Sequence, residues 1–162
     1  MALTVGQRAP EFELPGIDGT SGEEITVSLR SKLELPVVLA FYPADDSPVC
    51  SRQLDAYTNG IANLGQSPLN LLAISPQNIE SHRTFAQGHG GFGFPLLCDV
   101  DLSVARDYGV LGLMNLYRRC IVVIDPNGIV TYVHRSIGPG ITYQSFDRIL
   151  TAALSASAPG SS

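Results

Sequence analysis

Cys50 is the residue of this sequence best placed to act as a nucleophile. It follows the apolar run 36–42 and opens a stretch with helical periodicity. The sulfur is therefore expected at the carboxyl end of a buried strand and in the first turn of a helix. The positive end of a helix stabilises anions, and the thiolate is the reactive form of cysteine. The sequence thus predicts a reactive thiol at residue 50.

The loop before Cys50 carries residue types that suit attack on a peroxide. Ser47 lies three positions before the sulfur, and its hydroxyl and the N–H groups of the helix start could hold peroxide oxygens. Pro43 is expected to fix the loop and shield the sulfur. A nearby arginine would stabilise the thiolate and polarise the O–O bond. Asp45 and Asp46 are expected to be solvated charges that oppose this activation.

The segment around Cys50 resembles the Pro-x-x-x-Thr/Ser-x-x-Cys motif of the peroxiredoxin family, with Pro43 and Ser47 in the matching positions. The flanking sequence is similar to the bacterioferritin-comigratory, or Q-type, branch of the AhpC/TSA superfamily. The likeness extends over nearly the whole chain, with landmarks at residues 5–15, 81–85, 94–99 and 119–125.

This resemblance implies a thiol-dependent peroxidase that serves antioxidant defence by reducing hydrogen peroxide and organic hydroperoxides. Cys50 would be oxidised to a sulfenic acid. Arg119 falls on the family's active-site arginine, with Arg118 as the alternative if the strand register shifts by one. Gln53 falls where the family places a polar residue beside that arginine. No cofactor or metal is implied, and the partners would be a peroxide and thioredoxin, glutaredoxin or another thiol reductant.

The route that reduces oxidised Cys50 is left open by the sequence. Many Q-type members carry a resolving cysteine five residues after the peroxidatic one, but here that position is Asp55. Either another cysteine of the chain forms a disulfide with Cys50, or an external thiol reduces it directly.

Cys98 is the better internal candidate. Its strand should run parallel to the strand before Cys50, so both cysteines should lie at the same edge of the sheet. Cys120 should also lie near that edge, but side chains alternate along a strand, so it should face away if Arg119 faces the sulfur. A Cys50–Cys98 disulfide would still require the first helical turn to unfold, because the two Cα atoms must approach within about 7 Å.

The periodicity predicts an α/β fold, a central mixed β-sheet flanked by helices on both faces with an N-terminal β-hairpin. The family resemblance implies that this is the thioredoxin-like fold. We expect strands at 12–14, 25–27, 37–42, 69–74, 94–97, 120–124 and 129–133, and helices at 50–64, 76–87, 102–108 and 143–154. Ser75 and Asp101 are the expected N-caps of the second and third helices. Residues 1–154 are expected to form a single domain and 155–162 a flexible tail.

Composition excludes several classes of function. The net charge is −5 and no basic cluster is present, which argues against nucleic acid as a partner. No apolar run is long enough to span a membrane, and the N-terminus does not resemble a secretory signal. Three cysteines without a close pair suit a reducing compartment, so we expect a cytoplasmic protein. The family resemblance implies either a monomer or a homodimer.

Two other functions are alternatives to a peroxidase. A thiol–disulfide oxidoreductase is disfavoured because Ser47 stands where a Cys-x-x-Cys pair would have its first cysteine. A peroxide-sensing switch or holdase-like protein on the same fold stays open. His82, His89 and His134 are not expected to converge on Cys50.

Overall fold

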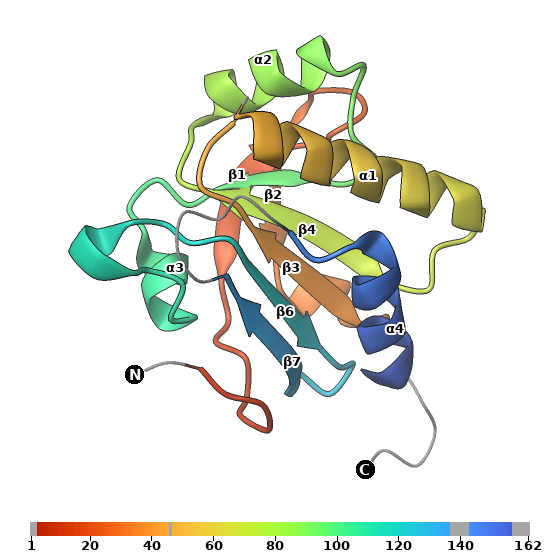
Figure 1. Cartoon of the computed structure of the whole chain (residues 1–162), viewed down its shortest axis with the longest axis vertical. Helices are drawn as coiled ribbons and strands as arrows, with labels where there is room; N and C mark the ends of the chain where they lie inside the picture. Colours follow the sequence, from red (N-terminus) through yellow and green to blue (C-terminus); the bar gives the residue numbers. More distant parts are fainter. Residues whose placement is uncertain (1–2, 46, 137–142, 157–162) are drawn as a thin grey trace.

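The computed structural model describes residues 3–45, 47–136 and 143–156. These residues form a seven-stranded mixed sheet in the order β2-β1-β5-β4-β3-β6-β7 (Figure 1). The strands are β1 (Glu13–Ile17), β2 (Glu24–Ser28), β3 (Val37–Phe41), β4 (Asn70–Ser75), β5 (Leu96–Cys98), β6 (Cys120–Ile124) and β7 (Val130–Arg135). The helices are α1 (Pro48–Leu64), α2 (Ile79–Gly88), α3 (Ser103–Asp107) and α4 (Phe146–Ala156), with short 3₁₀ segments η1 (Arg30–Lys32) and η2 (Leu113–Asn115).

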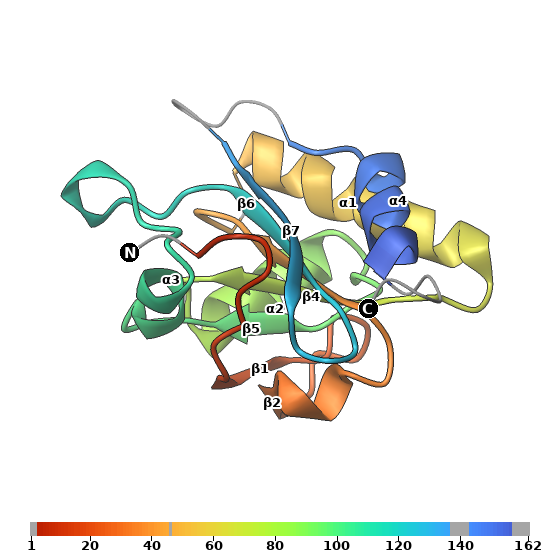
Figure 2. The ribbon, with the colours of Figure 1, turned by 90° about the horizontal axis from the view of Figure 1, so that it is seen from below.

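The central strand β3 is buried on both faces, and its alternating side chains divide the core in two. Val38 and Ala40 pack with buried residues of α1, α2 and α4. Leu39 and Phe41 pack instead with buried residues of α3. Figure 2 shows α1 and α4 side by side on one side of the sheet. The predicted arrangement, with helices on both faces of a mixed sheet, is therefore confirmed.

Strand directions bring the ends of three strands to one edge. β3 is parallel to β4, and β4 is parallel to β5. β6 runs antiparallel to β3, with Phe41 opposite Cys120. The carboxyl ends of β3 and β5 and the start of β6 thus lie along the edge where α1 begins. The N-terminal hairpin is also present, as β1 paired with β2.

Helix α1 starts two residues before the predicted position. Ser47 is its N-cap, in extended conformation, and Pro48 occupies the first helical turn. Proline suits that place because its missing N–H would have no partner inside the helix. Gly65 ends the helix with a φ of 70°, as its sequence position predicted.

The caps predicted for α2 and α3 are wrong. Ser75 is the last residue of β4, and Asn78 caps α2 by accepting the N–H of the third residue after it. For α3, the carboxylate of Asp99 accepts two N–H groups of the helix at 3.1 and 2.9 Å. Asp101 accepts a single N–H from the residue two positions later. In both cases the side chain that accepts from the helix N–H groups belongs to a nearby polar turn residue, Asn78 for α2 and Asp99 for α3.

Helix α4 is shifted relative to its prediction. It begins at Phe146 and continues through Ser155 and Ala156, which were assigned to the tail. Ala156 is buried in the core cluster beneath α1 and α4, and this contact favours the extra turn. The rest of the predicted tail, 157–162, lies outside the described residues. No helix in the described part of the chain is both long enough and apolar enough to cross a membrane.

Close packing of α1 on α4 depends on Gly60. A Cβ atom at this position would lie 2.3 Å from Cδ2 of Phe146, well inside van der Waals contact. Glycine normally weakens a helix interior by about 1 kcal/mol relative to alanine, and here its lack of a side chain lets α4 approach.

We expect Gly60→Val to lower the free energy of unfolding by about 1–3 kcal/mol, the usual range for overpacking. The neighbouring Asn59 is exposed on the same helix, so Asn59→Val should change stability by no more than about 0.5 kcal/mol. Urea denaturation of both variants measures the difference. Equal stability of the two variants would contradict the packing role of Gly60.

Candidate active site

Cys50 lies in the first turn of α1, at the carboxyl end of β3, and is fully buried. Its backbone N–H donates to the hydroxyl oxygen of Ser47 at 3.3 Å. The sulfur is thus held at the positive end of a 17-residue helix. This is the position that the sequence predicted for it.

Arg119 brings a guanidinium group to the sulfur. Both terminal nitrogens, Nη1 and Nη2, lie 3.4 Å from Cys50 Sγ, and the arginine is only 5% exposed. Arg119 precedes β6, whose first residue pairs with Phe41 at the end of β3, so the strand register determines this contact. A permanent cation with two donors aimed at the sulfur stabilises its thiolate form.

The adjacent arginine has a different environment. Arg118 is exposed, and its side chain lies across the backbone of Gly112. The predicted register, in which residue 119 rather than 118 faces Cys50, is therefore the one that the structure has.

Gln53 holds the guanidinium from the other side. Its Oε1 accepts a hydrogen bond from Arg119 Nη1, and its Nε2 donates to the hydroxyl of Tyr57 at 3.2 Å. Tyr57 in turn donates to the backbone carbonyl of Gln144 at 2.6 Å. Burial raises the pKa of Tyr57 far above its ordinary value, so the hydroxyl stays protonated and keeps donating.

This chain of hydrogen bonds continues to β7. The side-chain oxygen of Gln144 accepts from the Tyr132 hydroxyl at 2.7 Å, and its nitrogen lies 3.3 Å from Nε2 of His134. Sequence reasoning found Gln53 but missed Tyr57, Tyr132 and Gln144. The spacing of Gln53 and Tyr57, four residues apart on a helix, was the only local signal.

Pro43 and Ser47 lie in the half-buried loop between β3 and α1. The hydroxyl oxygen of Ser47 accepts the backbone N–H of Cys50 as the helix cap, and a hydroxyl that accepts in this way can still donate its own hydrogen. Its O–H therefore remains suited to a substrate oxygen. Shielding of the sulfur by Pro43 stays a prediction.

Cys98 is not in contact with Cys50 in this state. It ends β5 opposite Ser75 of β4, two strands away from β3, whereas Arg119 contacts the sulfur from the β6 side. All three cysteines are free thiols. A Cys50–Cys98 disulfide therefore requires a rearrangement of the chain around Cys50.

Cys120 faces the opposite side of the sheet and packs in the core cluster that contains α3. Burial raises the pKa of its thiol to about 12, so it remains protonated at neutral pH. Cys120 is therefore a core residue and not a reactive thiol.

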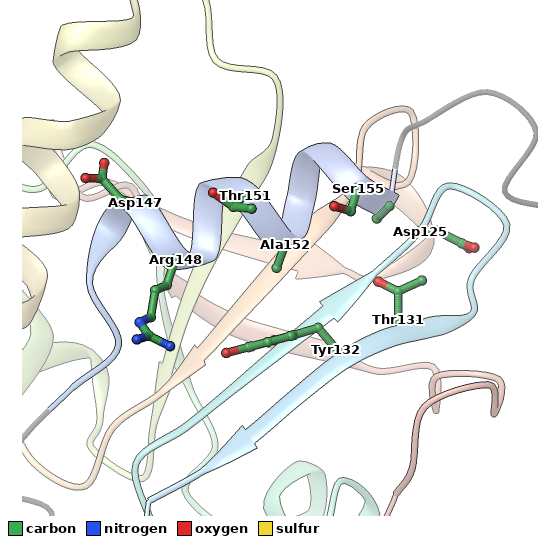
Figure 3. Close-up of a pocket in the computed structure, with 9 residues that line it drawn as sticks. Asp125, Thr131, Tyr132, Asp147, Arg148, Thr151, Ala152 and Ser155 are labelled. Atoms are coloured by element: carbon green, nitrogen blue, oxygen red, sulfur yellow. The ribbon is translucent and has the colours of Figure 1, made fainter.

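One cavity of the structure lies away from these groups. It has a volume of about 630 Å³ between α4 and β7, lined by Tyr132, Arg148 and Thr151 among others (Figure 3). None of the predicted site residues lines it. Within the described ranges, no cluster of three His, Cys, Asp or Glu side chains has the arrangement of a metal site.

Comparison with known proteins agrees with this geometry. Residues 5–133 match the model of the AhpC/TSA family. The chain is 31% identical over 140 residues to the putative peroxiredoxin bcp of Coxiella burnetii, covering 82% of this chain and 89% of the relative. It is 32% identical over 136 residues to peroxiredoxin Q of Oryza sativa subsp. japonica chloroplasts, covering 83% of this chain and 60% of that protein.

A solved structure shares the fold. The Mycobacterium tuberculosis AhpC structure superposes with a TM-score of 0.84 at 20% identity, covering 96% of this chain and 93% of the other. The fold is therefore the thioredoxin-like arrangement that the sequence resemblance implied. With a family model over most of its length and relatives above 30% identity, the chain belongs to the AhpC/TSA family, among the peroxiredoxins.

Proposed function

We propose that the protein is a thiol-dependent peroxidase that reduces hydrogen peroxide and organic hydroperoxides, with Cys50 as the peroxidatic cysteine. The observation that carries this proposal is the contact of both Arg119 terminal nitrogens with Cys50 Sγ at 3.4 Å, in the first turn of a helix. Membership of the peroxiredoxin family supports the same reaction.

In the first step, the Cys50 thiolate attacks one oxygen of the peroxide. The O–O bond breaks, the other oxygen takes up a proton and leaves as water or an alcohol, and the sulfur becomes a sulfenic acid. Arg119 stabilises the charge on the sulfur before attack and on the leaving oxygen during it. Gln53 keeps the guanidinium in place by accepting from Nη1.

In the second step, a thiol must reduce the sulfenic acid. Cys98 can do this by forming a disulfide, which thioredoxin or glutaredoxin would then reduce, or such an external thiol can act on Cys50 directly. The three free cysteines support work in a reducing compartment such as the cytoplasm.

We expect Cys50→Ser to abolish peroxide consumption in a steady-state assay with a thioredoxin system. Cys120→Ala is the matched control, because it removes a thiol on the other face of the sheet and should retain activity. Many turnovers per Cys50 support the peroxidase. One stoichiometric oxidation without turnover would contradict it and favour a peroxide-sensing switch.

We expect Arg119→Lys to lower the second-order rate of Cys50 oxidation by roughly a hundredfold. Lysine keeps the charge but cannot place two donors on one sulfur, and loss of a donor that stabilises developing charge has an effect of this order. Arg118→Lys is the matched control, since this neighbour is exposed and points elsewhere.

Stopped-flow measurement of the reaction with hydrogen peroxide gives both rates. Equal rates for the two lysine variants would contradict the assigned role of Arg119.

A further inference from the structure

A buried charged pair holds the loop between β3 and α1, which leads to Cys50 and is called the Cys50 loop below. Asp45 Oδ2 and His82 Nδ1 are 2.7 Å apart, and their side chains are 3% and 0% exposed. Ser81 donates its hydroxyl to the same Oδ2, and Tyr42 donates to Oδ1, both at 2.7 Å. Asp45 was expected to be a solvated loop charge, and that prediction is wrong. It is held by three side chains, that of Tyr42, which follows β3, and those of Ser81 and His82 in α2.

His82 is the positive member of this pair. Burial lowers the pKa of His82, but hydrogen bonds with Asp45 and with the Cys98 thiol, together with the charge of Asp45, outweigh burial and raise it to about 9. Its Nε2 lies 2.9 Å from the carbonyl oxygen of Leu97, so both ring nitrogens have acceptors, as an imidazolium requires.

The polar groups that face this ring come from each neighbouring element. Asp45 lies in the loop, Tyr42 at the end of β3 and Cys98 at the end of β5. Glu80, on α2, lines the cavity of about 320 Å³ that Asp45 also borders. Among these groups, His82 is the cation at neutral pH.

The pair connects the two cysteines of the proposed cycle. Asp45 is five residues before Cys50, in the loop that leads into α1, and its backbone N–H donates to the side-chain oxygen of Gln77 at 3.0 Å. His82 Nε2 lies 2.9 Å from the carbonyl oxygen of Leu97, the residue before Cys98. One ion pair thus fixes the base of the Cys50 loop beside the thiol of Cys98.

The chain between Asp45 and Cys50 is long enough to bring the sulfurs together. β5 lies two strands from β3, and two strand spacings amount to about 10 Å. Five extended residues span up to about 17 Å. Unwinding the first turn of α1 would therefore let Cys50 reach Cys98 while Asp45 stays in place.

We propose that Asp45 and His82 are positioning residues of the resolving step: they anchor the Cys50 loop beside Cys98 and hold an imidazolium against the attacking thiol. This inference rests on the proposed peroxidase function. The Cys98 sulfur attacks the sulfur of the Cys50 sulfenic acid, the S–O bond breaks and an S–S bond forms. The hydroxide and the proton given up by Cys98 leave together as one water molecule, so no further oxidant or reductant is needed.

The pair should also make stability depend on pH. The raised pKa of His82 means that the folded protein binds its proton more tightly than the unfolded chain does. The contribution of protonated His82 to the free energy of unfolding is fully present below pH 6.5, the ordinary pKa of histidine. It is lost as the pH rises through about 9, the pKa in the folded protein. The urea midpoint of the native protein should therefore exceed that of His82→Asn by an amount that shrinks between pH 6.5 and 9.5. A constant difference would contradict the charged pair.

The decisive experiment follows one turnover without reductant. One equivalent of hydrogen peroxide is added to the reduced protein. Samples are quenched over time to measure Cys50 sulfenic acid by dimedone trapping and the Cys50–Cys98 disulfide by peptide mass mapping. In His82→Asn we expect disulfide formation at pH 7 to slow at least tenfold and sulfenic acid to accumulate. The deficit should disappear towards pH 9.5, where hydroxide removes the thiol proton.

His89→Asn is the matched control. His89 is the C-cap residue of the same helix and pairs with Asp55 at 3.0 Å, and this pair is partly exposed. Asp45→Asn is a second test variant that keeps the shape of the carboxylate, and it should show the same deficit with the same alkaline rescue.

Three results would overturn the inference. The first is disulfide formation at the native rate in both test variants. The second is an equal slowing of Cys50 oxidation and of disulfide formation, without rescue at alkaline pH. The third is oxidation of Cys50 in the native protein without any Cys50–Cys98 disulfide. The last result leaves the proposed peroxidase intact. Absence of any peroxide consumption by the native protein would instead overturn the peroxidase itself.

Discussion

The contact between Arg119 and Cys50 is the constraint on which the rest of the site depends. A guanidinium that is 95% removed from solvent must be paired, because an isolated buried charge is strongly destabilising. The sulfur supplies one partner and the Gln53 side chain another. The contact therefore has a structural role as well as a chemical one, because it gives a partner to a cation that the fold has already buried.

The position of this contact follows from the sheet. Strand β6 pairs with β3 in the antiparallel direction, and Cys120 lies opposite Phe41. The residue before β6 therefore lies next to the turn that leads into α1. A shift of one residue in this register would place Arg118 at the sulfur and turn Cys120 towards the face covered by α1, α2 and α4. Burial of apolar side chains on both faces of these strands fixes the register, and in this way core packing determines the chemistry at the edge.

Much of this arrangement could be predicted from sequence because it follows local rules. The apolar run and the turn residues before Cys50 placed this thiol at the start of a helix, and alternation along β6 placed Cys120 on the other face. The facing arginine came from the family resemblance. The contacts that escaped prediction join residues far apart in the chain: Asp45 with His82, and Tyr57 with Gln144. An exposed-looking loop acid gives no local sign that a distant helix will cover it. The helix caps were missed for a related reason, since several neighbouring residues could each have served.

Different contacts hold the first turn and the middle of helix α1. Its middle is tied to the segment before α4 through Tyr57, and Gly60 packs against Phe146. Its first turn depends on the Ser47 cap and on the contact with Arg119. One helix thus contains two units of different local stability, and opening of the first need not disturb the second. Amide protection should accordingly rise along the helix, so that the turn with Cys50 can open many times while the molecule as a whole stays folded.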